Sequence, residues 1–360
     1  MKYYIIVGEA SGDLHASNLV KAIKANDPSA EFRGWGGDKM KDEGVELVKH
    51  YKEVAYMGFS EVIKHLPTIF KNLKACKEDI IQYNPDVVIP VDYPGFNLRI
   101  AEFTHEQKIK TVYYISPQVW AWKEGRVKKI KKLVDRLMVI LPFEKDFYKK
   151  HNMEVDFVGH PLLDVITDND ISTRSENIIA VLPGSREQEI SKMLPLMLKM
   201  KKHFGEYEFH VAKAPSLNED YYSQFLKEGI HLHTGSSYDL LKKAKAALVT
   251  SGTATLETAL FKVPQVVCYK GSAISYNIAK KLVKINYISL VNLIMDKEVV
   301  TELIQSDFNE KRLKKELDAI LNDSENTQAM LDNYSELRNK LGNSGASANA
   351  ARLILSELQA

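Results

Sequence analysis

The segment IIAVLPGSREQEI, from Ile178 to Ile190, contains the transition that decides the fold. A run typical of a buried strand stops at Pro183, two very small residues follow, and a polar stretch begins with Arg186. An unbroken apolar run rich in Ile and Val is typical of a strand buried on both faces. The polar stretch has the composition of a first helical turn. The segment therefore predicts a strand, a glycine turn and a helix N-terminus.

Similar apolar runs recur along the chain, with helical stretches between them. Alternation of buried strands with helices predicts parallel β-α-β units and an α/β fold. The expected strands are Tyr3–Val7, Glu31–Gly34, Val87–Val91, Thr111–Ile115, Leu137–Leu141, Val155–Val158, Ile178–Leu182, Glu208–Ala212, Ile230–His233, Ala246–Val249 and Gln265–Tyr269.

The polar segment Gly159–Asn177 lacks periodicity and predicts a hinge linker. Because 360 residues exceed the usual size of one core, we expect two domains. The expected domains are residues 1–164 and residues 165–360. Each is expected to be doubly wound and Rossmann-like, and the two are expected to face each other across a cleft. The chain is expected to be helical from about Asn309, and a final helix restarts after Gly345. The sequence leaves open whether this helix packs back on the N-terminal domain.

The composition excludes several classes of protein. Hydrophobic residues make up 45% and charged residues 27%, as in globular proteins, and a net charge of +2 argues against nucleic acid as a partner. Cys76 and Cys268 lack metal-site spacing and suit a reducing compartment. The first apolar run ends at Gly8, so it predicts a strand and not a signal peptide. We expect a cytosolic protein, or one that lies on a membrane without crossing it.

Two loops have the features of phosphate sites. Ligands of open α/β sheets bind beyond the carboxyl ends of the strands. At the first loop, Gly184-Ser185-Arg186, the N–H groups of the following helix and its dipole favour an anion. Arg186 adds a forked positive charge. At the second, Ser251-Gly252-Thr253 leaves a strand, and Glu257 follows on the helix, where it can hold a ribose diol. The pair predicts a nucleoside diphosphate site; a chance pair of capped helices is the alternative.

Two further loops follow strands near the N-terminus. GEASGD, from Gly8 to Asp13, lets the backbone approach a ligand, and Ser11 or Asp13 can cap the next helix. It matches neither a dinucleotide fingerprint nor a P-loop, and an ordinary tight turn is the alternative. In DVVIPVDYPGFN a buried strand delivers Asp92, either as a general base or as a cap for the turn at Pro94.

Trp120 and Trp122 come directly after another expected strand. They can line a sugar or acyl site or form a packed lid. The basic run Lys123–Lys132 is expected on one helix, as a solvated face or as a surface for an anionic ligand or membrane. Asp168–Asp170 lies in the linker and is interpreted as a turn, so no metal and no cofactor are expected.

One stretch has the pattern of an amphipathic helix. Its apolar stripe is flanked by lysines and consists of Val62, Ile63, Leu66, Ile69, Phe70 and Leu73, with Met57 and Phe59 before it. Packing on the sheet and an interfacial helix touching anionic lipid are both open.

Together these motifs resemble the lipid-A-disaccharide synthase family. The stretches that carry the resemblance are GEASGDLH, AYMGFSEV, VDYPGFN, YYISPQVWAWKEGRVKKI, LPFEKDFY, FVGHPLLD, LPGSREQEI, SGTATLETAL and YISLVNLI, in family order from Gly8 to Ile294. The resemblance implies an inverting, metal-independent glycosyltransferase of GT-B architecture. It implies that UDP-2,3-diacylglucosamine and 2,3-diacylglucosamine 1-phosphate yield a β-1,6-linked disaccharide 1-phosphate and UDP, a step of lipid A (lipopolysaccharide) biosynthesis. The expected place is the cytoplasmic face of the inner membrane, as a peripheral protein; the oligomeric state is not implied.

The resemblance also implies roles for single residues. Asp92 corresponds to the general base that accepts the proton of the acceptor's 6-hydroxyl. The implied donor site consists of Gly184, Ser185, Arg186, Ser251, Gly252, Thr253, Glu257 and Asn292. We assign to the acceptor side Glu9, Ser11, Gly12, Ser116, Gln118, Trp120, Lys123 and Arg126, with Lys123, Arg126 and Lys128 as candidates for the 1-phosphate. The membrane patch implied is Met57, Phe59, Val62, Ile63, Leu66, Ile69 and Phe70.

The chain departs from the family at Gly95. Many members read D-A-P-D-F-N where this chain reads DYPGFN, so a second carboxylate is absent next to Asp92. Two other hypotheses remain open at this stage. A UDP-sugar epimerase of similar fold needs no lipid patch, and a non-catalytic carrier of UDP-lipid needs no Asp92.

Overall fold

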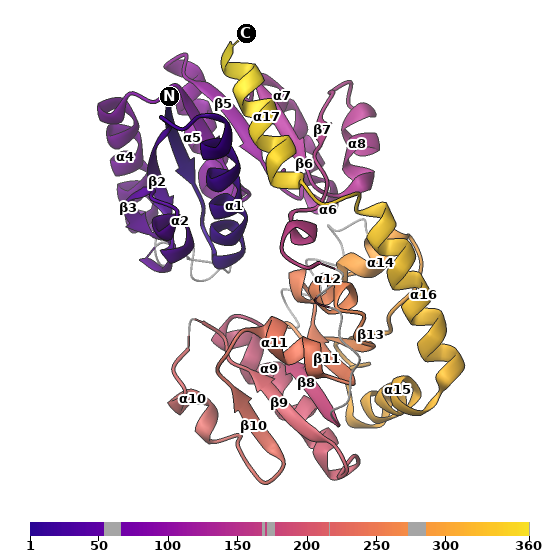
Figure 1. Cartoon of the computed structure of the whole chain (residues 1–360). Helices are drawn as coiled ribbons and strands as arrows, with labels where there is room; N and C mark the ends of the chain where they lie inside the picture. The colour runs from indigo at the N-terminus through magenta and orange to yellow at the C-terminus, as the bar shows by residue number, and fades with distance from the viewer. Residues whose placement is uncertain (54–65, 168–169, 171–176, 216, 273–285, 360) are drawn as a thin grey trace. The chain divides into compact units, whose positions relative to one another are not determined.

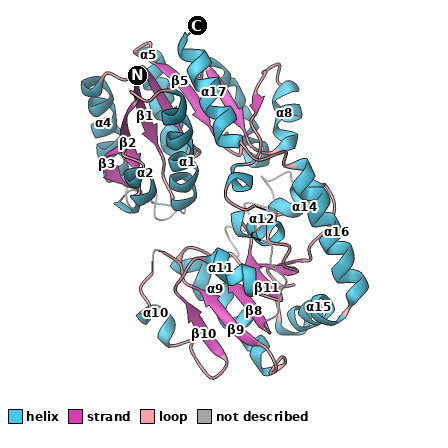
Figure 2. Ribbon diagram, viewed as in Figure 1, coloured by secondary structure: helices cyan, strands magenta, loops and turns pink. Residues whose placement is uncertain are grey.

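The structure, a computed structural model, describes the chain except residues 54–65, 168–169, 171–176, 216, 273–285 and 360 (Figure 1). The chain divides into two compact units. The first contains Met1–Asp164 and Asn343–Ala360, and the second contains Val165–Gly342. Each unit has one parallel sheet with helices between its strands (Figure 2).

The first unit contains a seven-stranded sheet in the order β3-β2-β1-β4-β5-β6-β7. Its strands are β1 (Lys2–Ile6), β2 (Glu31–Gly36), β3 (Glu46–His50), β4 (Val87–Pro90), β5 (Lys110–Tyr114), β6 (Arg136–Val139) and β7 (Asp156–Phe157). Its helices are α1 (Ala10–Asn26), α2 (Asp38–Asp42), α4 (Leu66–Tyr83), α5 (Pro94–Glu106), α6 (Val119–Trp122), α7 (Val127–Leu133), α8 (Pro142–Lys149) and α17 (Ala346–Gln359), with short 3₁₀ turns at Tyr51–Glu53, Glu124–Arg126 and Pro161–Asp164.

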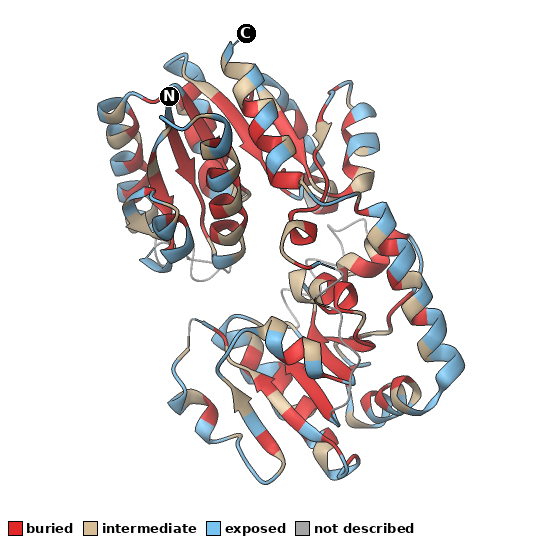
Figure 3. Cartoon of the chain, viewed as in Figure 1, coloured by how far each residue is buried: buried red, intermediate tan, exposed pale blue. Residues whose placement is uncertain are grey.

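Burial of both faces explains why β1 carries large hydrophobic residues from Tyr3 to Ile6. Tyr3 and Ile5 point to a cluster that includes residues of α1 and α17. Tyr4 and Ile6 point the other way, to a cluster with residues of α4 and α5. All four side chains are fully buried, and Figure 3 shows the strands as buried between helices with exposed outer faces. The alternation follows from the two-residue period of a strand.

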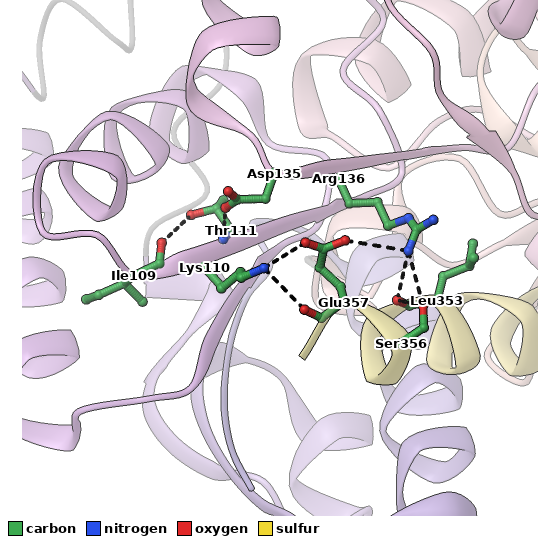
Figure 4. A network of polar contacts seen from close by, with 8 residues as sticks. All are labelled: Ile109, Lys110, Thr111, Asp135, Arg136, Leu353, Ser356 and Glu357. Carbon is green, nitrogen blue, oxygen red and sulfur yellow. Dashed lines mark hydrogen bonds and ion pairs between the residues drawn. The ribbon is translucent and has the colours of Figure 1, made fainter. Parts of the chain in front are cut away.

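The final helix, α17, belongs to the first unit. Figure 4 shows Glu357 between two cations that stand at the starts of β5 and β6. Lys110 Nζ donates to Glu357 Oε1 at 2.9 Å, and Arg136 Nη1 lies 3.6 Å from Glu357 Oε2. Arg136 also donates to the carbonyl of Leu353 and the hydroxyl of Ser356. These contacts fix the end of α17 on the sheet.

The start of α17 is held by Asp164. Its carboxylate accepts hydrogen bonds from the backbone N–H groups of Gly345, Ala346 and Ser347, the last at 2.8 Å. Asp164 is the last residue before the chain leaves the first unit, and Asn343 is the first residue after it returns. The two crossing points are therefore tied together by one side chain.

The second unit contains a six-stranded sheet in the order β10-β9-β8-β11-β12-β13. Its strands are β8 (Ile178–Leu182), β9 (Glu208–Ala212), β10 (Ile230–His233), β11 (Ala246–Thr250), β12 (Gln265–Tyr269) and β13 (Glu302–Ile304). Its helices are α9 (Glu187–Leu198), α10 (Asp220–Ser223), α11 (Ser237–Lys243), α12 (Thr253–Leu260), α14 (Leu290–Met295), α15 (Glu310–Asn322) and α16 (Ser324–Lys340), with a 3₁₀ turn at Lys199–Lys202.

Two local expectations are corrected. The basic run from Lys123 does not lie on one helix, because a 3₁₀ turn, Glu124–Arg126, precedes α7. Asp13 does not cap its own helix; its carboxylate accepts from the N–H groups of Gly37, Lys39 and Met40 at the start of α2. Within the expected linker, Pro161–Asp164 forms a 3₁₀ turn in which Leu162 and Leu163 are buried.

Among the described helices, none combines the length and the apolar character that crossing a bilayer requires.

Candidate functional site

The loop after β4 presents Asp92 in an unusual backbone conformation. Asp92 and Tyr93 have φ values of 44° and 48°, and Ile115, after the neighbouring strand β5, has a φ of 61°. Side chains other than glycine rarely adopt this region, and such residues cluster at functional sites. The strain falls on the loops beyond the carboxyl ends of adjacent strands, where α/β proteins bind ligands.

Tyr93 explains why Gly8 is glycine. A Cβ at Gly8 would lie 2.3 Å from Cγ of the Tyr93 ring, closer than any real contact. The ring also stacks on Phe96 at 5.6 Å between centroids. The loops after β1 and β4 are therefore packed face to face, which brings Glu9 toward Asp92.

Hydrogen bonds fix the backbone of Asp92. Asn97 Nδ2, from α5, donates to the Asp92 carbonyl at 2.8 Å, and the Tyr113 hydroxyl donates to the same oxygen. The Asp92 N–H donates to the carbonyl of Ile115 at 3.2 Å. These partners hold the left-handed conformation that the loop requires.

Burial raises the pKa of Asp92 to about 7, and the negative charge of Glu9 adds to this rise. Hydrogen bonding to the backbone of Tyr93 opposes it only in part. A carboxylate with a pKa near neutrality can exist in the basic form and still have a useful proton affinity. The geometry thus suits a general base at the end of β4.

The loop after β1 supplies Glu9, Ser11 and Gly12. The Ser11 hydroxyl donates to Glu9 Oε1 at 2.7 Å. Gly12 is buried at the start of α1, and a Cβ there would lie 3.2 Å from Cβ of Val7. Glu9 is thus oriented by a neighbour on the same loop.

A second buried carboxyl group, that of Glu144, lies near Asp92. Glu144 is 1% exposed. It accepts hydrogen bonds from the N–H groups of Ile140 and Leu141 and, at 3.2 Å, from Nε1 of Trp120. Burial raises its pKa to about 8, and the charge of Asp92 is among the causes. The sequence motif LPFEKDFY contains Glu144, but nothing in its pattern shows that the side chain is buried.

The other residues predicted for the acceptor side have distinct surroundings. Ser116 is buried, with its hydroxyl 2.7 Å from that of Tyr148. Gln118 is exposed at the start of α6. Lys123 and Arg126 are partly exposed. The pKa of Lys123 is lowered, mainly by its partial burial and further by the positive charge of Arg126. Two cations held close together suit an anionic group of a ligand.

In the second unit, the loop after β8 has the predicted strand–turn–helix form. Gly184 has a φ of 115°, Arg186 is the N-cap of α9, and both Ser185 and Arg186 are exposed. The carboxylate of Glu189 lies over this loop, 3.2 Å from the Ser185 nitrogen and 3.1 Å from Arg186 Nη1.

The loop after β11 has the same form. Gly252 is exposed with a φ of 141°, and α12 begins at Thr253. The Ser251 hydroxyl donates to the carbonyl of Ile288 at 2.8 Å. Glu257 accepts from the Tyr238 hydroxyl at 3.0 Å, and burial raises its pKa. The sequence does not indicate that Tyr238 belongs to this site, because Tyr238 lies on α11 and its partner Glu257 lies on α12.

Asn292, predicted for the donor site, is held entirely by hydrogen bonds within the protein. It is fully buried. Its amide nitrogen donates to Val300 O and Glu302 Oε1, and its oxygen accepts from the N–H groups of Val299 and Val300. All four hydrogen-bonding positions are thus filled by protein, so in this conformation Asn292 braces the segment before β13.

The expected membrane patch is described only in part. Met57, Phe59, Val62 and Ile63 lie outside the described residues. Leu66 and Phe70, on α4, are 37% and 58% exposed. Ile69 instead packs against the buried cluster beneath α4.

Within the described part of the chain, no three His, Cys, Asp or Glu side chains gather where one metal ion could be held.

Comparison with known proteins gives a consistent result. A family model described as lipid-A-disaccharide synthetase matches residues 3–355. The lipid-A-disaccharide synthase of Syntrophus aciditrophicus is 41% identical over 98% of this chain and 96% of its own length. That of Trichlorobacter lovleyi is 37% identical over 99% and 97%.

Solved structures share the fold. The glycotransferase of kitacinnamycin superposes with a TM-score of 0.69 at 13% identity, covering 99% of this chain and 98% of the other. A Methanocaldococcus jannaschii UDP-GlcNAc 2-epimerase, in complex with UDP-GlcNAc and UDP, gives 0.67 at 13%, covering 99% and 100%. The two Rossmann-like units are thus of GT-B type.

Proposed function

Because the chain belongs to the lipid-A-disaccharide synthetase family, we propose that its two loop clusters perform the two halves of one glycosyl transfer. The enzyme joins UDP-2,3-diacylglucosamine to 2,3-diacylglucosamine 1-phosphate. It forms the β-1,6-linked disaccharide 1-phosphate and UDP.

The observation that carries the catalytic assignment is the position and pKa of Asp92. The carboxylate stands at the end of a buried strand, and burial raises its pKa to about 7. In a single in-line displacement, Asp92 accepts the proton of the acceptor's 6-hydroxyl as the oxygen attacks the anomeric carbon of the donor. The anomeric configuration is inverted, because one displacement occurs. Gly95 provides no second carboxylate, but the negative charge of Glu9 lies near Asp92 and raises its pKa.

The leaving UDP is assigned to the second unit. The N–H groups at the start of α9 and α12 favour the charge that develops on the diphosphate, and Arg186 adds a permanent cation. Glu257, partly buried and oriented by Tyr238, is assigned to the ribose. Replacement of Arg186 by Ala is expected to cost at least about 3 kcal/mol of transition-state stabilisation.

We assign the protein to the cytoplasmic face of the inner membrane, as a peripheral protein. Phe70 is exposed, and the Arg99 guanidinium lies 5.6 Å from its ring centre. Lys74 and Lys77 line the same surface hollow. Glu78 and Glu102 also line the hollow, so cations exceed carboxylates there by three to two. An exposed aromatic ring beside excess cations fits anionic lipid headgroups above acyl chains. Phe70→Glu should reduce sedimentation with phosphatidylglycerol vesicles, whereas Ile81→Glu, which alters another exposed apolar residue of α4, should not.

The decisive experiment measures UDP release from UDP-2,3-diacylglucosamine with and without 2,3-diacylglucosamine 1-phosphate, in detergent. Release that requires the acceptor and is lost in Asp92→Asn supports the transferase and its base. Release or isomerisation of the donor without acceptor would support an epimerase instead. Tight donor binding with no turnover would support a carrier.

A further inference from the structure

The carboxylate of Glu189 occupies the loop to which the diphosphate is assigned. Oε2 lies 3.2 Å from the Ser185 nitrogen, and Oε1 lies 3.1 Å from Arg186 Nη1. These are a backbone N–H and a guanidinium, the two kinds of donor that a phosphate group uses at a helix start. The side chain therefore makes with its own loop the contacts that a bound anion would make.

Gly184 is shaped around this carboxylate. A Cβ at Gly184 would lie 2.7 Å from Glu189 Oε2 and 2.9 Å from Glu189 Cβ, so any other residue would displace the side chain. The Glu189 side chain is 29% exposed and is held in place by its contacts with Ser185 and Arg186, so it can rotate toward solvent when these contacts are taken over. A phosphate cannot accept from Ser185 and Arg186 while the carboxylate does so without strong repulsion between the anions.

We propose that Glu189 is an internal competitor of the nucleoside diphosphate. The donor displaces the carboxylate from Ser185 and Arg186 on binding. After transfer, the carboxylate returns and lowers the affinity for the product UDP, which speeds its release. This inference rests on the proposed function, since it requires the diphosphate at this loop.

The alternative role for Glu189 is helix capping. Glu189 is the third residue of α9, where a glutamate or a glutamine stabilises a helix by accepting from N–H groups at its start. Glutamine keeps that ability and removes the charge. Glu189→Gln therefore separates competition, which needs the charge, from capping, which does not.

The test is calorimetric titration with UDP of the wild type and four variants. Glu189→Gln is expected to bind UDP about fivefold more tightly. The control Glu187→Gln, which removes an exposed carboxylate from the first residue of the same helix, should match the wild type. Arg186→Ala should bind at least about tenfold more weakly. In the Arg186→Ala background, Glu189→Gln should give a smaller gain, because part of the competition acts through Arg186.

The outcomes separate the inference from the proposed function. If Arg186→Ala binds UDP as the wild type does, the diphosphate is not at this loop, and the competition has no basis. If Arg186→Ala weakens binding but Glu189→Gln equals the wild type or weakens it, the donor site stands and the competition is overturned. Inhibition by UDP gives an independent readout: the inhibition constant should fall in Glu189→Gln, with an unchanged thermal midpoint showing that the fold is intact.

Discussion

Nε1 of Trp120, on α6, donates a hydrogen bond to the buried carboxyl group of Glu144, on α8; these helices follow the adjacent strands β5 and β6. The indole is also fixed by edge-to-face contact with Phe143, at 4.9 Å between ring centres. An aromatic wall that is held in two directions costs little ordering when a ligand binds. If Trp120 lines the acceptor side as we propose, Glu144 acts there through the position of Trp120.

Glu144→Ala and Trp120→Phe should each raise KM for the acceptor, and their effects should not add. Since Trp120→Phe removes the donor of the shared hydrogen bond, Glu144→Ala should cost less in that background, with a coupling of about 1 kcal/mol. The measurement is a double-mutant cycle on acceptor kcat/KM. Full additivity would show that Glu144 only stabilises the start of α8.

Asp92→Asn should reduce turnover by at least about 100-fold, because no base then accepts the 6-hydroxyl proton. In the wild type, kcat/KM should rise with pH and level off above about 7, the pKa of Asp92. Acceptor-dependent UDP release checks the loss of turnover and the pH profile. It is measured from about pH 5 to about pH 9, roughly 2 units on each side of the Asp92 pKa. A profile without a limb near neutrality would remove Asp92 from the role of base.

The same carboxyl group should make stability depend on pH. The folded-state pKa of Asp92 is about 7 and the ordinary value is 3.8, so between them the folded protein binds more protons than the unfolded chain. Stability from this group therefore falls as the pH rises through this window. The thermal midpoint of Asp92→Asn should be higher than that of the wild type at a pH above 7. The two midpoints should approach each other near pH 4, about the ordinary pKa of aspartate. Asp146→Asn, at an exposed position of α8, controls for the loss of one charge.

Gly8→Ala should lower the free energy of unfolding by about 1–3 kcal/mol, because the methyl group collides with the ring of Tyr93. Turnover should fall as well, since Tyr93 adjoins Asp92. The matched control is Gly95→Ala, where an added Cβ meets nothing within 4 Å. Denaturant unfolding measures the stability of the two glycine variants. In a Tyr93→Ala background, Gly8→Ala should cost less stability. A Gly8→Ala protein as stable as the wild type would contradict the packing of Tyr93 against Gly8.

Ile354→Ala should lower the free energy of unfolding by about 2–5 kcal/mol, because Ile354 is fully buried between α17 and the sheet. Arg352→Ala changes an exposed residue of the same helix and should cost far less. Urea denaturation compares the two. Equal losses would mean that α17 is held by its polar contacts alone.

Most strands were predictable, including the edge strand β10, whose bounds Ile230–His233 match the prediction. Ile178–Leu182 and Gln265–Tyr269 have the predicted bounds, because both faces are buried and the apolar run is continuous. β3 and β13 were missed, because β3 has only two apolar residues between charged and polar ones and β13 is only three residues long. At the site, Asp92 and Arg186 could be found because each directly follows a strand. Glu144 and Glu189 could not, because a carboxylate in a first helical turn looks like an ordinary cap until its contacts are known.

The bond between Asp164 and the start of α17 has a consequence for synthesis on the ribosome. The second unit is an insertion within the first, so residues 165–342 must be made before α17 emerges. Until then, the apolar residues Leu19, Val20 and Ile23 lack part of their cluster. The N-terminal unit therefore begins to fold first but is completed last, and a nascent chain stalled before Asn343 should be a substrate for chaperones that bind exposed apolar surface.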